Sequence, residues 1–281
     1  MANVLKPERR AAVVAALVEG NSINATVRMT GVAKNTILKL LVELGAVCAA
    51  YQDEHLRDLP CKRLQCDELW AFCYSKAKNV PAEKTGQFGF GDVWTFVAVD
   101  ADSKLVPSFL VGSRDAGCAQ EFMTDLASRL ANRVQLTTDG HKMYLSAVEE
   151  AFGGDVDFAQ LVKVYGKVPT DGPHRYSPPD CIGTEKQAVT GCPDRKHVST
   201  SYVERQNLTV RMGMRRFTRL TNAFSKKVEN LIAAVAIHYM HYNFCRPHMS
   251  LNGRTPAQAA GVTTRKWTVQ DVVSLLETAA N

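Results

Sequence analysis

The chain has 281 residues, with 34 Lys or Arg against 28 Asp or Glu and a formal net charge of +6. Hydrophobic residues make up 46% and aromatic residues 8%, which is typical of a globular protein and excludes a disordered or collagen-like one. The longest nearly uncharged apolar run, 231–237, is far shorter than the roughly 20 residues that span a bilayer. The N-terminus lacks the order of a secretory signal, so we expect a cytoplasmic protein without a membrane segment.

Residues 1–50 have the pattern of a small helical domain. Apolar residues recur at helical spacing over 7–19, 23–30 and 34–44, with Ser22 as a cap of the second helix and Gly31 and Gly45 as helix ends. This order predicts a helix-turn-helix, in which the third helix enters the DNA major groove. The residues expected to contact DNA are Lys34, Asn35, Thr36 and Lys39. A helical bundle used for docking or dimerisation has the same pattern and is the alternative.

Residues 51–63 are acidic and polar, which suits a linker, and the pattern then changes to that of an α/β domain over 64–249. The expected elements are strands at 64–72, 93–99 and 105–111, a helix at 117–130, a strand at 134–138, a helix at 141–152 and a strand at 158–165. This order is typical of an RNase H-like core. The predicted fold class is therefore α/β, a mixed sheet with flanking helices behind an all-α helix-turn-helix domain.

A segment rich in proline and glycine, 166–199, follows, and we expect an insertion loop without regular structure there. Helices are predicted at 201–220 and 225–242, and a C-terminal tail at 250–281 contains a last helix at 268–278.

The eight cysteines match no zinc or disulfide pattern, and we expect them to be reduced, mostly buried thiols. The chain has no C-x-x-C, and the nearest approach to a zinc site, Cys181 and Cys192 with His197 and His174, is irregularly spaced. We therefore expect no zinc.

Three acidic residues are candidates for catalysis. Asp67 lies in an apolar strand, where a carboxylate is costly unless it is paired or binds a metal, Asp139 ends another strand, and Glu204 begins a helix. Carboxylates that converge at strand ends bind Mg²⁺ or Mn²⁺, and two such ions support phosphoryl transfer. Glu68 is expected on the opposite face of its strand and is the rival to Asp67, while Glu185 is the substitute for Glu204.

Each of the three also has an ordinary structural explanation. Asp67 suits an ion pair at a strand edge, Asp139 suits an Asp-Gly turn, and Glu204 suits the start of a helix, where the dipole favours a negative charge. Their order on successive elements favours the catalytic interpretation.

A run of seven basic residues without an acid follows Glu204. Arg211 and Arg215 are expected on the same helix face as Glu204, so a DNA backbone on this stripe would lead to the carboxylates. A solvated basic face is the alternative. The run consists of Arg205, Arg211, Arg215, Arg216, Arg219, Lys226 and Lys227.

Several motifs together resemble the DDE transposases of bacterial insertion sequences, closest to the insertion-sequence-one group. They are the stretches 66–72 (CDELWAF), 138–140 (TDG), 201–207 (SYVERQN), 242–248 (YNFCRPH) and 255–257 (TPA). The resemblance covers about residues 60–260. One departure is the missing zinc finger of that group, since no cysteine precedes Cys48.

The resemblance implies a metal-binding triad of Asp67, Asp139 and Glu204 that frees a 3′-hydroxyl at element ends and joins it to target DNA. It implies two Mg²⁺ or Mn²⁺ ions, terminal inverted repeats and target DNA as partners, a homo-oligomer, and a location at the bacterial nucleoid. The supporting residues would be Trp70, His141, Tyr144, Asn207, Arg246 and His248. The alternatives are an inactive helix-turn-helix regulator or domesticated remnant, and an RNase H-type nuclease.

Overall fold

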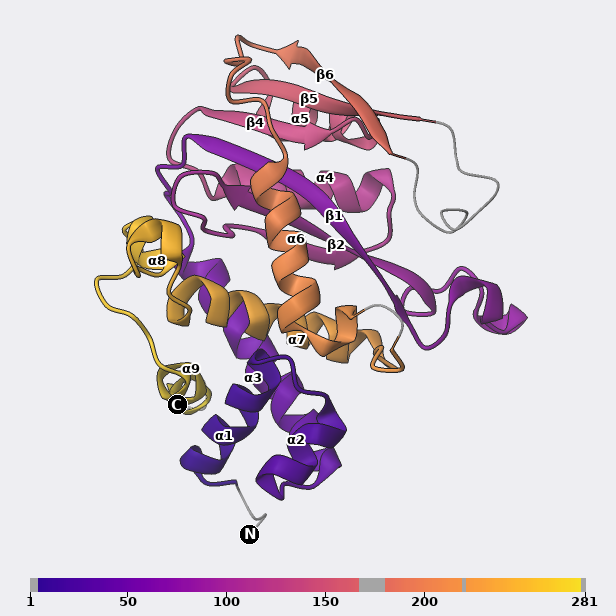
Figure 1. Ribbon diagram of the computed structural model, residues 1–281, viewed down its shortest axis with the longest axis vertical. Coiled ribbons are helices and arrows are strands. Elements are labelled where there is room, and N and C mark those ends of the chain that lie inside the picture. Colours follow the sequence, from indigo (N-terminus) through magenta and orange to yellow (C-terminus); the bar gives the residue numbers. More distant parts are fainter. Residues whose placement is uncertain (1–4, 167–179, 219–220, 279–281) are drawn as a thin grey trace.

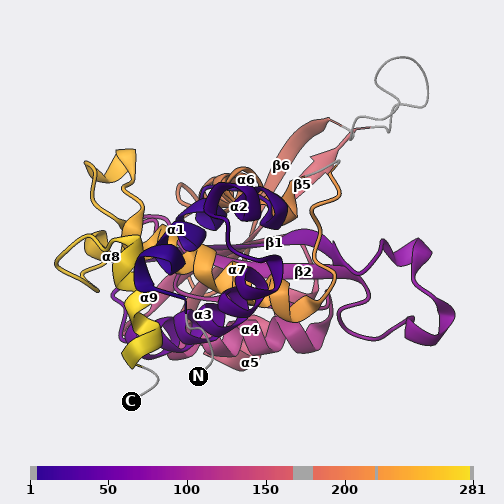
Figure 2. The ribbon, with the colours of Figure 1, turned by 90° about the horizontal axis from the view of Figure 1, so that it is seen from below.

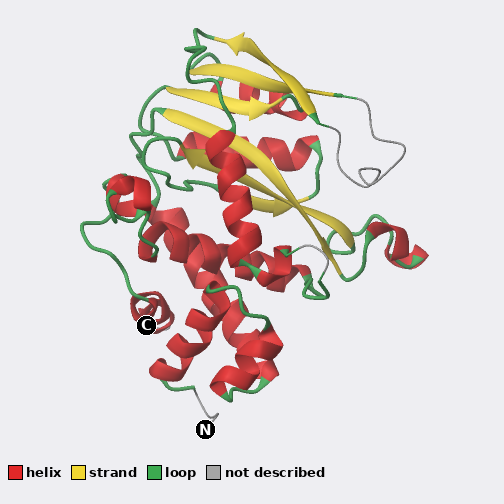
Figure 3. Cartoon of the chain, in the orientation of Figure 1, coloured by secondary structure: helices red, strands yellow, loops and turns green. Residues whose placement is uncertain are grey.

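The computed structural model describes residues 5–166, 180–218 and 221–278. His174 and Arg219 lie outside these ranges. In the described part, several helices lie at one side of a mixed sheet and others cover its two faces, and no helix is long and apolar enough to cross a membrane (Figures 1 and 3). The helices are α1 (Pro7–Val18), α2 (Ile23–Thr30), α3 (Lys34–His55), α4 (Ala116–Ser128), α5 (Met143–Phe152), α6 (Ser201–Gly213), α7 (Val228–Met240), α8 (Pro256–Ala259) and α9 (Val269–Thr278).

The six strands form one sheet in the order β3-β2-β1-β4-β5-β6. β1 is antiparallel to β2 and parallel to β4, and β4 is parallel to β5. The predicted order of three strands, a helix, a strand, a helix and a strand is confirmed, and with it the RNase H-like α/β fold class. The strands are β1 (Arg63–Cys73), β2 (Gly91–Asp100), β3 (Phe109–Gly112), β4 (Val134–Asp139), β5 (Val156–Tyr165) and β6 (Cys181–Thr190).

Helices cover both faces of the central strands, and Figure 2 shows α4 and α5 on one side of the sheet and α6 on the other. Leu64 and Cys66 of β1 belong to the core that includes α4 and α5, whereas Leu69 and Ala71 pack with residues of α6 and α7. A central strand buried on both faces needs apolar residues at nearly every position. The carboxylates of Asp67 and Glu68 are therefore exceptions within β1.

The first three helices largely follow the prediction. Ser22 caps α2 by accepting a hydrogen bond from the Ala25 N–H at 3.1 Å, and Gly31 ends α2 in the left-handed conformation at φ +64°. The predicted end of the third helix at Leu44 is wrong, because α3 continues through Gly45 to His55. A Cβ on Gly45 would lie 2.4 Å from the Ala233 Cβ, so this glycine allows α3 to pack closely on α7.

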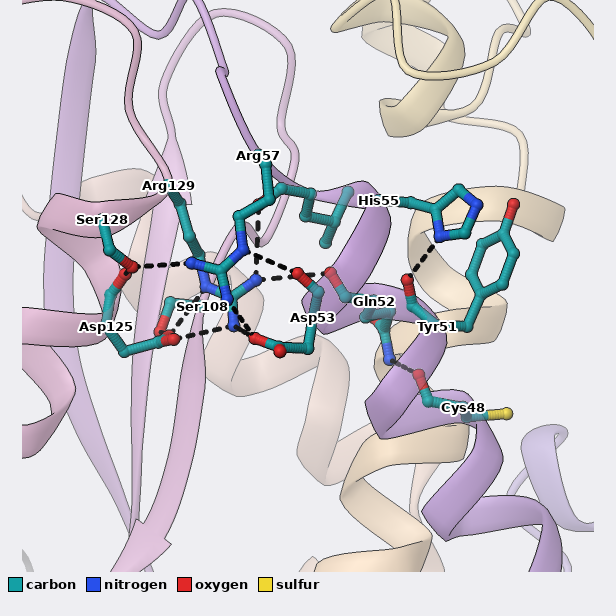
Figure 4. A network of polar contacts seen from close by, with 11 residues as sticks. Cys48, Tyr51, Gln52, Asp53, His55, Arg57, Ser108, Asp125, Ser128 and Arg129 are labelled. Atoms are coloured by element: carbon teal, nitrogen blue, oxygen red, sulfur yellow. Dashed lines mark hydrogen bonds and ion pairs between the residues drawn. The ribbon is translucent and has the colours of Figure 1, made fainter. Parts of the chain in front are cut away.

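Arg129, just after α4, joins the C-terminal end of α3 to the sheet domain (Figure 4). Its guanidinium donates to the carbonyl oxygens of Gln52 and Leu56 at 3.3 Å and to carboxylate oxygens of Asp53 and Asp125 at 2.8 Å. The bond to the Leu56 carbonyl satisfies a backbone group that the end of the helix leaves without a helical partner, whereas the Gln52 carbonyl also accepts the Leu56 N–H at 3.0 Å. Residues 51–55 of the predicted linker are thus helical, and Arg129 bonds the end of this helix to the sheet domain.

The third strand was predicted at 105–111, but β3 begins only at Phe109, and further differences lie around 166–220. The insertion was expected to have no regular structure, but its residues 181–190 form β6, which pairs with β5. No proline occurs between 180 and 192, so every residue of β6 retains its N–H. α6 ends at Gly213 instead of 220, and the last helix α9 lies close to its predicted range.

Candidate metal centre

Three acidic side chains converge where β1 passes the end of β4. One carboxylate oxygen each of Asp67, Glu68 and Asp139 lies within 4.8 Å of the others. The parallel register explains this, because Cys66 pairs with Thr138 and the next residue on each strand is Asp67 and Asp139. Of the expected triad, the structure brings Asp67 and Asp139 together.

Asp67 is held at both carboxylate oxygens. The N–H of Glu68 donates to Oδ1 at 2.8 Å, and Nδ2 of Asn207 on α6 donates to Oδ2 at 2.9 Å. Burial, with the nearby charges of Glu68 and Asp139, raises the pKa of Asp67 to about 7, although the hydrogen bond from the Glu68 N–H and the charge of Lys163 lower it. The carboxylate is oriented, yet among the described residues no cationic side chain forms an ion pair with it.

Glu68 is almost wholly enclosed, with 1% of its side chain exposed. Arg114 Nη2 donates to Oε2 at 3.0 Å, and the Tyr144 hydroxyl lies beside the carboxylate, while the buried Oε1 forms no well-aligned hydrogen bond among the described residues. Burial raises the pKa of Glu68, and the charge of Asp139 adds to this. A buried carboxylate oxygen without a partner is costly, and a bound cation would satisfy it.

The sequence predicted that Glu68 faces away from Asp67. Glu68 does interact with the buried Tyr144 of α5, whose pKa rises well above its usual value through burial and the charge of Glu68. Its carboxylate nevertheless belongs to the acidic cluster. Two adjacent acids in an apolar strand were the signal in the sequence that both have a role.

Glu204 lies in the first turn of α6, as predicted, but its carboxylate is not part of the acidic cluster. Its Oε1 lies 2.7 Å from Nζ of Lys163 on β5 and accepts a hydrogen bond from the Thr200 hydroxyl. Its side chain is 41% exposed. Glu185, the predicted substitute for Glu204, lies on β6, where it pairs with Val162, and not in a loop.

Two buried polar residues hold α6 and the end of β4 in place, and neither was predicted from the sequence. Oε1 of Gln65, two residues before Asp67 on β1, accepts the N–H groups of Tyr202 and Val203 at 2.8 and 3.2 Å, which fixes the start of α6. Gln160 Nε2 donates to the Asp139 carbonyl oxygen at 3.0 Å. The sequence could have indicated this role only by placing a polar residue, Gln65 or Gln160, at a buried strand position.

Three of the predicted supporting residues interact with the cluster, namely His141, Asn207 and, as described above, Tyr144, and the others lie elsewhere. The His141 N–H donates to Asp139 Oδ1 at 3.0 Å, and Asn207 contacts Asp67 as described. His248 accepts from the Ser250 N–H in the tail, and the neighbouring Arg246 is exposed. Trp70 is 36% exposed and lies three residues beyond Asp67.

The basic run does not form one helical stripe. α6 ends at Gly213, so the expectation that Arg215 shares the helix face of Glu204 is wrong. Arg216 does not lie on a solvated face. Its Nη1 donates to Ser225 Oγ at 2.6 Å, and burial lowers its pKa to about 10. Arg205 and the four predicted DNA contacts of α3 are exposed. Those four are Lys34, Asn35, Thr36 and Lys39.

The donor set fits a hard divalent cation. It consists of carboxylate oxygens, which Mg²⁺ and Mn²⁺ prefer, and it includes the buried, unpartnered Glu68 Oε1. Within the described residues, no other group of three His, Cys, Asp or Glu side chains has this spacing. Such a site can bind a phosphate backbone through the cation and support phosphoryl transfer.

No protein-family model and no curated protein matches the chain. Among solved structures, it is similar to the Mos1 transposase paired-end complex with left transposon end, at 14% identity and a TM-score of 0.25, over 56% of this chain and 60% of that chain. It is also similar to the piggyBac transposase synaptic complex with hairpin DNA, at 11% identity and a TM-score of 0.42, over 99% of this chain and 73% of that chain. In the paired-end comparison the chain spans 60% of the Mos1 chain, slightly less than two thirds.

Proposed function

We propose that this protein is a DDE-type transposase of an insertion sequence, which cleaves and joins DNA with Mg²⁺ or Mn²⁺. The observation that supports this most is the convergence of Asp67, Glu68 and Asp139 within 4.8 Å at the junction of β1 and β4. A buried carboxylate oxygen without a partner, Glu68 Oε1, makes a cation at this place favourable.

The residues of the chain would hold the ions and the DNA in place. Asp67, Glu68 and Asp139 would be the ligands, with Asn207 and the Glu68 N–H orienting Asp67. When bound, two such ions activate the attacking oxygen and stabilise the leaving one. Arg114 restrains Glu68, and Gln65 holds α6 against β1.

Glu204 is proposed as the third member of the triad. α6 already contacts the cluster through Asn207, three residues after Glu204 and thus on the same side of the helix. For Glu204 to join the cluster, its carboxylate would leave Lys163. The exposed N-terminal residues of α3 would read the terminal repeats, and two DNA ends would be joined by a homo-oligomer.

The test is cleavage of a DNA substrate that carries the repeats flanking the coding region, with Mn²⁺ present. We expect Asp67→Asn and Asp139→Asn to lower the cleavage rate by at least about a hundredfold while DNA binding is retained. Asp92→Asn is the control, because Asp92 is exposed on β2 of the same sheet. Equal cleavage by all three variants would refute the proposed site.

The ion pair between Glu204 and Lys163 favours a second candidate, a DNA-binding regulator that lacks catalysis. This candidate predicts that the parent protein binds the repeats and never cuts them, with Mg²⁺ or with Mn²⁺. Metal-dependent cleavage that Glu204→Gln abolishes would exclude it.

A further inference from the structure

A cavity of about 650 Å³ lies at the far end of β1, between this strand and the segment after α6. We call it the Trp70 pocket. Its aromatic lining is Trp70, Phe72, Phe217 and Phe224. Its basic lining is Lys76, Lys78, Arg211 and Arg216, and the residues that line it include no Asp or Glu.

The aromatic side chains form a continuous row. The ring centroids of Trp70 and Phe72 are 5.8 Å apart, and those of Phe72 and Phe224 are 4.6 Å apart. The two walls are tied together, because the Tyr74 N–H donates to the Ser225 carbonyl oxygen at 2.9 Å. Trp70, at 36% exposure, is the ring in this row whose surface is most open to a ligand.

The pocket has a charge suited to phosphate. Arg216 Nη1 is bound to Ser225 Oγ, but Nη2 is buried and has no hydrogen-bond partner among the described residues. A guanidinium carries a permanent positive charge, so Arg216 favours an anionic ligand such as phosphate in this cavity. Lys76 and Lys78 are exposed beside it.

Two elements connect the pocket to the metal centre. Along β1, Trp70 follows Asp67 by three residues, which is roughly 10 Å at strand spacing. Along α6, Arg211 follows Asn207 by four residues, which is about 6 Å at helical rise and on the same face. With about 3.4 Å between stacked nucleotides of one strand, the pocket lies about two or three nucleotides from the metal centre.

We propose that the Trp70 pocket binds an unpaired nucleotide of a DNA strand that lies across the metal centre, with its base on Trp70 and its phosphate at Arg211 and Arg216. This inference rests on the proposed function for the identity of the ligand. Sequence-tolerant binding of single strands combines aromatic rings for bases with basic groups for the backbone, and both line this cavity. Paired bases in a duplex already stack on their neighbours, so the pocket selects unpaired DNA.

The experiment measures binding of the full chain to a fluorescent 12-nucleotide oligo-dT and to a duplex of the same length, in EDTA, by anisotropy. We expect Trp70→Ala to weaken oligo-dT binding about tenfold or more and duplex binding much less. Trp70→Phe retains a stacking ring and keeps most of the affinity. Phe88→Ala is the matched control, because Phe88 is 47% exposed on the connection between β1 and β2 and does not line the pocket.

Thermal unfolding of each variant shows whether its fold is intact. The proposal is overturned if Trp70→Ala, still folded, binds oligo-dT as the parent does, or if it weakens duplex binding equally. It is also overturned if Phe88→Ala weakens oligo-dT binding as much as Trp70→Ala. Because the assay contains no metal, absence of cleavage would refute the proposed function without changing this result.

Discussion

Lys163 Nζ lies 2.7 Å from Glu204 Oε1, so the third predicted catalytic carboxylate is bound to an amine on β5 instead of joining Asp67 and Asp139. Lys163 also acts on Asp67, whose pKa its charge lowers. One cation therefore interacts with two of the three proposed triad members.

Replacing this lysine is expected to strengthen metal binding. In Lys163→Met, the positive charge near the acidic cluster is lost and Glu204 is released, so the affinity for Mn²⁺ should rise by at least about threefold. Isothermal titration calorimetry at constant ionic strength measures this change. Lys186→Met is the control, because Lys186 lies on β6 opposite Leu161 of β5 and its Nζ donates to the Arg195 carbonyl oxygen at 2.7 Å, and it should leave the affinity unchanged. Weaker binding in Lys163→Met would mean that the lysine supports the site.

The contribution of Asp67 to the stability of the metal-free protein should fall as the pH rises from about 4 to about 7. The pKa of Asp67 is about 7 in the folded chain, against about 4 for an ordinary aspartate. In this range the folded state binds more protons than the unfolded state, so raising the pH favours unfolding, and the full penalty is present above pH 7. Urea titrations of the parent and of Asp67→Asn at several pH values test this, and the stability of the parent relative to Asp67→Asn should fall between about pH 4 and about pH 7.

Stabilisation of the protein by Mn²⁺ should increase as the pH rises, because cation and proton compete for the same carboxylates. The rise in melting temperature that Mn²⁺ causes is expected to be larger at pH 8 than at pH 6. An equal rise at both pH values, or an equal rise in Asp67→Asn, would place the metal elsewhere.

Gly45→Ala tests the close packing of α3 on α7. Alanine favours a helix by about 1 kcal/mol over glycine, whereas overpacking costs about 1–3 kcal/mol. The new Cβ would lie 2.5 Å from the Ala233 Cα and 2.8 Å from its carbonyl oxygen, so the backbone itself must shift. We expect a net loss in the free energy of unfolding. In Gly117→Ala on α4, the nearest contact is an ordinary 3.4 Å, and no loss is expected.

Arg129→Met should lower the free energy of unfolding by about 2–3 kcal/mol, because it removes charge-assisted bonds to the end of α3 and to Asp125. Arg57→Met is a matched control, since Arg57 also contacts Asp53 but its side chain is 35% exposed (Figure 4). An exposed pair of this kind contributes less than about 1 kcal/mol. Equal losses in urea denaturation would show that burial of Arg129 is unimportant.

Local patterns predicted most elements, because they depend on neighbours in sequence. The apolar strand around Asp67, the cap at Ser22 and the Asp-Gly strand end at Asp139 all lie where the sequence predicted them. The end of α3 was missed because Gly45 is a helix-ending residue by local rules, and only its contact with Ala233 explains a glycine there. β6 was missed because the prolines around it dominate the composition of the segment.

The sequence by itself determined the order of the α/β elements and identified Asp67 and Asp139 as neighbours at the carboxylate site, since these follow from strand patterns and parallel pairing. Only the tertiary structure decided which other groups reach that site. Glu68 joins it where β4 ends, Glu204 is held by Lys163, and Trp70 and Arg216 line one cavity although they are 146 positions apart, 216 − 70 = 146. Such contacts depend on how distant elements pack, and packing is not encoded in the spacing of residues along the chain.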